Sequence, residues 1–317
     1  MPLEVPGALA AAHLKYGGEA GAAWTAALPA LAGRYLDEWD LSPDGAPRHG
    51  IMALVQPVVR ADGTKAALKL QPVTPETVHE GLALRTWAGD GAVRLLDADP
   101  ETGTMLLERL DGSRSLAAVP DVMQALDVLS GLLRRLVARP APEGLRRLDD
   151  IARAMLERAE KAAVRPMPEE ERYWVGLCAS AVTDLLSDPG EGAGEGAGED
   201  TRDGDRLLHW DLHYDNVLAG EREPWLAIDP KPLAGDPAFE LLPALHNRWD
   251  EALATGDAPR EVLRRFDFMV DALGLDRRRA AGWTLGRVLQ NLLWRLEDGH
   301  GPDGVQEQVA LAMRARW

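Results

Sequence analysis

The sequence predicts an α+β protein with two lobes, a small N-terminal lobe built on a β-sheet and a larger, mainly helical C-terminal lobe. In the first third of the 317-residue chain, alternating apolar runs are separated by turn residues and by helical patterns. From Val119 onward helical periodicity dominates, interrupted by one short hairpin-like stretch near residues 208–230. We place the boundary so that the lobes comprise residues 1–108 and 109–317.

The N-terminal lobe is expected to begin with a helix and to continue with two hairpins separated by a second helix. Ala61-Asp62-Gly63 is typical of a hairpin turn, and Thr74 followed by Pro75 is typical of a helix N-terminus. The second hairpin should turn between Asp99 and Gly103. The expected elements are a helix over residues 19–39, a loop over 42–50, strands over 51–59 and 65–70, a helix over 74–87, and strands over 92–96 and 104–107.

Composition and charge exclude several functional classes. The net charge of −16 argues against a nucleic-acid partner, because a phosphate backbone requires a basic face. No run of about 18 apolar residues suggests a membrane span, and the first residues lack the basic and apolar regions of a signal peptide. Cys178 is the only cysteine, so no internal disulfide is expected. We therefore expect a cytoplasmic protein, and the acidic charge favours a monomer.

The segment 188–205 repeats glycine, alanine and glutamate. Such a composition cannot bury apolar surface, so we expect a flexible acidic loop. It lies just before the hairpin-like stretch, which carries the most informative motif of the chain.

That motif has the form H-x-D-x-x-x-x-N and consists of His209, Asp211 and Asn216, with Asp229 following after a second apolar run. Phosphoryl transfer requires a carboxylate that accepts the proton of the attacking hydroxyl, for which Asp211 is the candidate. It also requires hard oxygen ligands for Mg²⁺, which Asn216 and Asp229 would supply while ATP and water complete the coordination. The pattern therefore predicts a phosphotransferase that uses ATP and Mg²⁺.

A metallohydrolase is the competing interpretation of the same residues. His209, Asp211 and His213 alternate, so on a strand all three could face one transition metal. That interpretation gives no role to Asn216 or Asp229, whereas phosphoryl transfer explains both. We therefore favour phosphoryl transfer, with the two histidines holding the loop by hydrogen bonds.

The N-terminal lobe supplies a candidate phosphate-binding lysine. Lys69 lies among apolar residues of the predicted strand over 65–70, and Glu80 in the following helix could pair with it. Lys65 is the alternative lysine, but it is more typical of a solvated strand residue. Glu76 is the alternative acid, although in the first helical turn it could simply complement the helix dipole.

The end of the last predicted strand is the candidate hinge that binds adenine through its backbone, with Glu108 and Leu110 as the expected contacts. The residues between Gly45 and Gly50 are the best candidate for a loop that covers the phosphates. A plain loop fits these residues equally well, because no glycine-rich phosphate motif is present.

These stretches together resemble the aminoglycoside phosphotransferases. The strings that carry the resemblance lie over residues 208–218, 225–230 and 235–237. Further stretches resemble the narrower branch of actinobacterial streptomycin 6-kinases, which is also named for hydroxyurea phosphorylation; they lie over residues 61–71, 105–113 and 282–291. The resemblance spans the chain from about residue 9 to about residue 299.

The resemblance implies a protein-kinase-like fold, with ATP and Mg²⁺ between the lobes and an antibiotic hydroxyl over the base Asp211. It implies phosphorylation of an aminoglycoside, most narrowly the 6-hydroxyl of streptomycin, which inactivates the drug. The wider family has glycine where this chain has Trp210, and tryptophan there supports the narrower branch. Lys231 follows the metal-binding aspartate, and we expect it to face solvent.

The cationic substrate would be bound by carboxylates of the C-terminal lobe, through charge-assisted hydrogen bonds to its guanidinium groups. The candidates follow the metal-binding aspartate and are Asp236, Glu240, Asp250 and Glu251. Asp236 could instead cap the next helix, and the last two could be surface charges. Two other functions remain open, namely a kinase of hydroxyurea, an amino sugar or another metabolite, and a non-catalytic nucleotide-binding protein.

Overall fold

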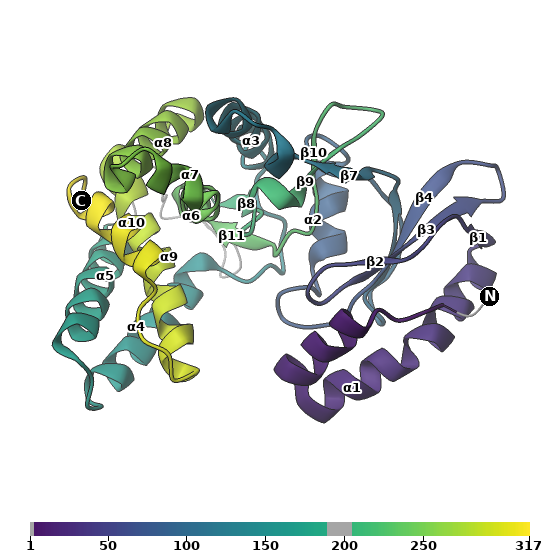
Figure 1. Ribbon diagram of the computed structural model, residues 1–317, viewed down its shortest axis with the longest axis horizontal. Coiled ribbons are helices and arrows are strands. Elements are labelled where there is room, and N and C mark those ends of the chain that lie inside the picture. The colour runs from purple at the N-terminus through teal and green to yellow at the C-terminus, as the bar shows by residue number, and fades with distance from the viewer. Residues whose placement is uncertain (1–2, 189–204) are drawn as a thin grey trace. The chain divides into compact units, whose positions relative to one another are not determined.

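The computed structural model describes residues 3–188 and 205–317, and Figure 1 shows its helices and strands. The chain forms two compact units: Met1–Ser113 with Ala219–Leu226, and Arg114–Leu218 with Ala227–Trp317. The small sheet-containing unit and the larger helical unit confirm the predicted α+β class. The return of residues 219–226 to the first unit was not expected. The predicted acidic loop over 188–205 lies outside the described residues, apart from its two ends.

The first unit consists of an antiparallel sheet and two helices. Its elements in chain order are α1 (Gly7–Glu38), β1 (Leu41–Pro43), β2 (Arg48–His49), β3 (Leu54–Arg60), β4 (Lys65–Leu70), α2 (Glu80–Trp87), β5 (Leu95–Asp99) and β6 (Thr104–Glu108). The sheet order is β1-β3-β4-β6-β5, and β2 also pairs with β3. The predicted loop over 42–50 is wrong in part, because its two ends form β1 and β2 through pairing with β3.

The helix predicted over residues 74–87 begins later than expected, at Glu80. Residues before it form turns that are held by threonine side chains. The Thr74 hydroxyl accepts a hydrogen bond from the Thr77 amide at 3.3 Å, and the Thr77 hydroxyl donates to the Pro72 carbonyl at 2.7 Å. Thr74 therefore caps a turn rather than the helix itself, since such short polar side chains compete with helical hydrogen bonding.

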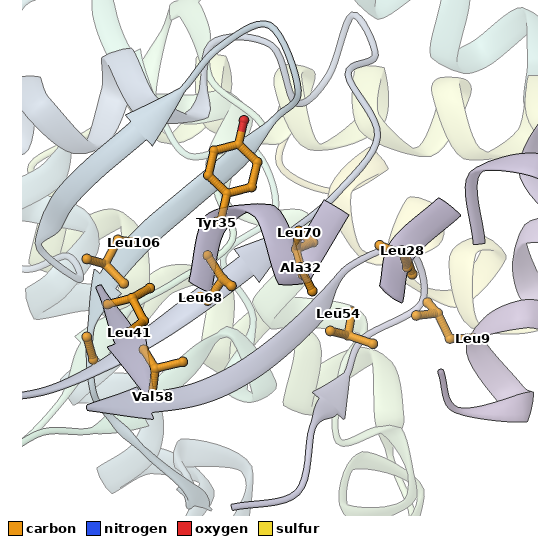
Figure 2. Packing of buried hydrophobic residues seen from close by; sticks show 11 residues of the cluster. Leu9, Leu28, Ala32, Tyr35, Leu41, Leu54, Val58, Leu68, Leu70 and Leu106 are labelled. Carbon is orange, nitrogen blue, oxygen red and sulfur yellow. The ribbon is translucent and has the colours of Figure 1, made fainter. Parts of the chain in front are cut away.

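Helix α1 covers one face of the sheet. Figure 2 shows Leu28, Ala32 and Tyr35 of α1 among leucine and valine side chains of the strands. The strand residues of this core include Leu68 and Leu70, both fully buried. Because side chains alternate across a strand, the side chain of residue 69 points to the opposite face.

Helix α1 is two helical segments joined by a kink at Gly18, where φ is 57°. The first segment was not predicted, and the second begins where the predicted helix does. His13 of the first segment is buried, stacks on Trp24 with ring centroids 4.5 Å apart, and lies with Nε2 3.0 Å from the Met52 carbonyl oxygen. A Cβ at Gly21 would lie 2.1 Å from the His13 carbonyl oxygen, so the two segments can approach only at a glycine.

The second unit is mainly helical, with short strands and short 3₁₀ helices (η) around the H-x-D motif and the residues that follow it. Its elements are η1 (Leu116–Ala118), α3 (Val122–Leu136), α4 (Leu148–Ala163), α5 (Glu169–Ser187), β8 (Arg206–Leu208), η2 (Tyr214–Asn216), β9 (Val217–Ala219), β10 (Leu226–Ala227), β11 (Leu233–Gly235), η3 (Pro237–Glu240), α6 (Leu242–His246), α7 (Trp249–Ala254), α8 (Ala258–Leu273), α9 (Arg277–Glu297) and α10 (Gly304–Arg314). Strand β7 (Asp111–Ser115) contains residues of both units, and so do β9 and β10, because Ala219 and Leu226 belong to the first unit.

Helix α9 is the central helix of the second unit, because nearly every residue from Ala280 to Leu293 is buried. Cys178 of α5 is fully buried, and burial raises the pKa of its thiol to about 12. Among the described helices, none is long and apolar enough to span a membrane. Strands β8 and β11 pair antiparallel and flank the residues of the H-x-D motif.

Candidate active site

Lys69 and Glu80 form a buried ion pair in the first unit. The Lys69 ammonium donates to both carboxylate oxygens of Glu80, at 2.7 and 2.8 Å, and both side chains are almost completely buried. The predicted contact between strand and helix is therefore present, and Lys65 is exposed at the start of β4. Two buried charged groups must be paired and hydrogen-bonded, because an unpaired buried charge strongly destabilises a protein.

Gln71 completes this buried group and was not identified from the sequence. Its side-chain amide donates to Glu80 Oε2 at 2.6 Å. Gln71 lies two residues after Lys69, so the alternation of an extended chain places both side chains on the face that α2 covers. The sequence signal that could have revealed it is a glutamine two residues after Lys69, directly after an apolar strand.

In the second unit, the residues of the H-x-D motif follow β8 directly. His209 is buried, and its two ring nitrogens are both engaged: Nε2 lies 3.0 Å from the Ile228 carbonyl oxygen, and Nδ1 accepts from the Asp211 amide at 3.4 Å. Burial, aided by the nearby charge of Lys231, lowers the pKa of His209 to about 3. The ring is therefore neutral and structural, as predicted.

The metal-binding candidates are brought together by backbone hydrogen bonds. The Ile228 amide donates to the Asn216 carbonyl oxygen at 2.9 Å, which places Asp229 beside Asn216. The Asn216 side-chain amide donates to the Asp211 carbonyl oxygen at 2.9 Å. Because Nδ2 of Asn216 makes this hydrogen bond, Oδ1 is the side-chain atom that can bind a cation. An amide oxygen and a carboxylate are hard ligands that fit Mg²⁺.

Burial raises the pKa of the Asp211 carboxyl, and the charge of Asp229 acts in the same direction. The electrostatic effects of His213, Lys231 and Arg287 on the Asp211 carboxyl oppose this shift. A carboxylate with a raised pKa is a better proton acceptor than an exposed one, which suits the role of a general base.

Lys231 does not simply face solvent, contrary to expectation. Its ammonium donates to Asp229 Oδ2 at 3.0 Å, and its amide donates to the His209 carbonyl oxygen at 2.9 Å. Asp229 has a φ of 58°, a conformation that non-glycine residues adopt rarely and that is common at functional sites. Lys231 therefore lies among the candidate site residues, in contact with Asp229 and His209.

Glu240 was expected to contact the substrate, and this prediction is wrong, because its side chain has no access to solvent. It is fully buried, and its carboxylate accepts hydrogen bonds from the backbone amides of His209 and Trp210. Burial raises the pKa of Glu240 to about 7, although these two hydrogen bonds favour the charged form. Its carboxylate holds the backbone immediately before Asp211, so Glu240 does not line a substrate site.

Asp236 is also fully engaged within the protein. Its Oδ1 accepts from the Ala238 amide at 2.8 Å, which caps η3, and its Oδ2 accepts from Arg279 and, at 3.0 Å, from the Trp283 indole. The capping alternative to a substrate contact therefore fits the structure better. Asp250 is exposed at the start of α7, and Glu251 accepts from Arg248 Nε at 2.6 Å while remaining partly exposed.

The backbone of Trp210 adopts a φ of 65°, which is easy for glycine and rare for a bulky residue. Two arginines lie over its indole ring, with guanidinium carbons 4.9 Å (Arg146) and 5.3 Å (Arg287) from the ring centroid. Arg287 of α9 also donates to the Trp210 carbonyl oxygen at 3.3 Å. These arginines were not identified from the sequence, because they lie far from the motif along the chain.

Most of the chain matches the model of a known protein family. The model of the aminoglycoside/hydroxyurea antibiotic resistance kinases matches residues 38–299. The chain belongs to this family. This kinase is 55% identical over 313 residues to a streptomycin 6-kinase from Streptomyces glaucescens. The aligned residues make up 98% of this chain and 97% of the relative. It is 50% identical to a hydroxyurea phosphotransferase from Kitasatospora aureofaciens, over 94% of this chain and 82% of the relative.

Solved structures of kinases share the fold of this resistance kinase. A thermostable mutant of an aminoglycoside phosphotransferase superposes with a TM-score of 0.56 at 16% identity, over 88% of this chain and 97% of that chain. A choline/ethanolamine kinase family protein from Mesorhizobium loti gives a TM-score of 0.55 at 16% identity, over 87% and 86% of the two chains. The predicted protein-kinase-like fold is confirmed. The metallohydrolase alternative is wrong, since the family is one of kinases and both nitrogens of His209 are engaged inside the protein.

Proposed function

We propose that this kinase transfers the γ-phosphoryl group of ATP to a hydroxyl of streptomycin, the 6-hydroxyl, and thereby inactivates the antibiotic. The observation that carries the proposal is 55% identity to streptomycin 6-kinases over nearly the whole chain. The presence of Lys69, Asp211, Asn216 and Asp229 supports catalysis rather than nucleotide binding alone. A cytoplasmic location, where ATP is available, is part of this proposal.

Asp211 is the proposed general base. As the substrate oxygen attacks the γ-phosphorus, its proton passes to the Asp211 carboxylate, and the bond between the γ-phosphorus and the bridging oxygen of ADP breaks. Asn216 Oδ1 and the Asp229 carboxylate would hold Mg²⁺, which neutralises charge on the phosphates. The neutral ring of His209 and the carboxylate of Glu240 keep the loop backbone in place during the transfer.

Lys69 is proposed to contact the phosphates, with its ammonium oriented by Glu80 and Gln71. The backbone of Glu108 and Leu110 is proposed to bind adenine. Asp250 and Glu251 remain the candidates for the guanidinium groups of streptomycin, because their carboxylates are at least partly exposed. A net charge of −16 favours encounter with such a cationic substrate.

A second candidate substrate is hydroxyurea. The observation in its favour is 50% identity to a hydroxyurea phosphotransferase. Hydroxyurea is small and neutral, so it would use the same base and metal ligands without the carboxylates that recognise guanidinium groups.

The test is ATP consumption by the purified protein with streptomycin, other aminoglycosides, hydroxyurea and amino sugars, with product masses measured. We expect turnover on streptomycin and a product heavier by one phosphoryl group. Turnover on another compound alone would move the substrate assignment and keep the catalytic residues. The Asp211→Ala variant should bind ATP and lose turnover by about 10²-fold or more. Turnover at the wild-type rate in this variant would refute the assignment of the base.

A further inference from the structure

One segment of the metal-binding hairpin belongs to the sheet-containing unit. Asn216 precedes β9 and Asp229 follows β10, and both lie in the second unit. The turn that connects these strands, Ala219–Leu226, is part of the first unit. Anything that fixes this turn therefore limits the freedom of the hairpin whose two ends carry the proposed Mg²⁺ ligands.

Arg222 at the tip of this turn is the side chain that fixes it. Its guanidinium donates to Glu108 Oε1 at 2.7 Å and Oε2 at 3.3 Å, to Glu223 Oε1 at 2.7 Å, and to the carbonyl oxygens of Gly89 at 2.8 Å and Ala92 at 3.1 Å. The planar guanidinium has five donor hydrogens in a fixed arrangement, so one arginine can satisfy all of these acceptors at once.

The partners of Arg222 come from two places that matter for nucleotide binding. Glu108 is the last residue of β6, in the proposed adenine-binding hinge, and its carboxylate also accepts from the Arg94 amide at 2.8 Å. Gly89 and Ala92 follow α2, the helix that carries Glu80. Arg222 therefore connects the hairpin turn with the end of β6 and with the segment that follows α2.

The absence of a side chain at Gly89 leaves space for the guanidinium of Arg222. Gly89 has a φ of 85°, and a Cβ there would lie 2.7 Å from Arg94 Cγ and 3.3 Å from Arg222 Nη2. The side chains of Arg222 and Glu108 are only 22% and 18% exposed, so their interaction is screened less by solvent than that of a surface pair. The hydrogen bond from Arg222 to Glu108 is the main cause of a raised arginine pKa.

We propose that Arg222 is a positioning residue for phosphoryl transfer: by fixing the turn 219–226 on Glu108 and on the segment after α2, it holds Asn216 and Asp229 in the geometry that binds the Mg²⁺ of the nucleotide. The side chain of Glu108 thereby acquires a role, separate from the adenine contact proposed for its backbone. This inference rests on the proposed use of ATP with Mg²⁺, but not on the identity of the phosphorylated compound.

The experiment compares wild type with Arg222→Gln, Arg222→Lys and Glu108→Gln. Arg60→Gln is the matched control, since Arg60 borders another hairpin turn of the same unit and its side chain makes an exposed contact of 3.5 Å with Asp62. Two quantities are measured: the shift in melting temperature that ATP causes at increasing Mg²⁺ concentration, and the Mg²⁺ concentration that gives half-maximal turnover. The melting-temperature shift requires no second substrate.

We expect Arg222→Gln to need about tenfold more Mg²⁺ for half of the ATP-dependent stabilisation, a size typical of changes behind metal ligands. Arg222→Lys and Glu108→Gln should need more Mg²⁺ than wild type, and Arg60→Gln should match wild type. An unchanged Mg²⁺ requirement in the Arg222 variants would overturn the inference while leaving the proposed function intact. If Arg222→Gln does not fold, the two milder variants decide in the same way. A wild-type protein that shows no Mg²⁺-dependent response to ATP would overturn both proposals.

Discussion

At the scale of single residues, the acid–base behaviour of Asp211 follows from its surroundings. The carboxylate is disfavoured by burial, so its pKa lies above the ordinary value of 3.8. As the proposed general base, Asp211 must be unprotonated to accept a proton, so we expect activity to be lost as the pH falls through this raised pKa.

We accordingly expect kcat/KM for streptomycin to decline on acidification with an apparent pKa above 3.8. The measurement is a pH–rate profile at saturating ATP. Glu240, whose pKa burial raises to about 7, is a second group that could shape the profile. The Glu240→Gln variant cannot titrate at that position, so a decline that persists in it belongs to Asp211. If kcat/KM of the Glu240→Gln variant stays constant until the pH reaches the ordinary pKa range of aspartate, the assignment of Asp211 as the base with a raised pKa is contradicted.

The ion pair of Lys69 makes a second prediction at this scale. In Glu80→Gln the ammonium loses a charged partner in a buried place, so its orientation toward phosphate weakens. We expect kcat/KM for ATP to fall roughly thirtyfold, which corresponds to a loss of about 2 kcal/mol of transition-state stabilisation. Glu76→Gln is the control, because Glu76 lies in the turn before α2 and should stay within about threefold of wild type. Equal losses in both variants would show that Glu80 has no special role.

At the scale of elements, the kinked helix α1 depends on a single close approach. The two helical segments meet where a Cβ at Gly21 would lie 2.1 Å from the His13 carbonyl oxygen. The contact is backbone against backbone, so no side chain can move aside. His13 in turn contacts the Met52 carbonyl in the turn between β2 and β3.

Gly21→Ala should therefore lower the free energy of unfolding by about 2 kcal/mol or more, since the segments must separate. Gly33→Ala in the same helix is the control. No atom lies within 4 Å of a Cβ at Gly33, so alanine there should stabilise the protein by up to about 1 kcal/mol. Urea unfolding of both variants measures the difference. A Gly21→Ala protein as stable as Gly33→Ala would rule out the close approach.

The elements also show which features could be predicted from the sequence. β4 and the Lys69–Glu80 contact were predictable because strand alternation and a following helix are local patterns. β1 and β2 were not, since these short strands exist only through pairing with β3. The positions of Glu240 and Arg222 depend on partners far along the chain, His209 and Glu108. Local periodicity carries no information about such contacts, which explains why Glu240 was assigned to the substrate and Arg222 was overlooked.

At the scale of the whole molecule, the charge of −16 should affect the encounter with the proposed cationic substrate. Its field attracts streptomycin at low ionic strength and is screened as salt is added, because the Debye length falls from about 10 Å at 0.1 M to about 3 Å at 1 M. The family motif says nothing of this effect, which belongs to the sum of all charges.

We expect KM for streptomycin to rise severalfold between about 0.05 and 0.5 M potassium chloride, while kcat changes little. The comparison compound is hydroxyurea, whose lack of charge should leave its KM nearly constant if it is a substrate. Where hydroxyurea is not turned over, sucrose at matched osmolarity replaces salt as the control. A KM for streptomycin that is independent of salt would mean that the acidic surface serves solubility alone.

The division of the chain has a consequence for how the protein is made. Residues 219–226 complete the first unit, although more than a hundred residues separate them from its main segment. During synthesis, which proceeds from the N-terminus, Glu108 leaves the ribosome long before Arg222 exists. The sheet unit therefore lacks the arginine partner of Glu108 until most of the helical unit has been synthesised and residues 219–226 have joined the first unit.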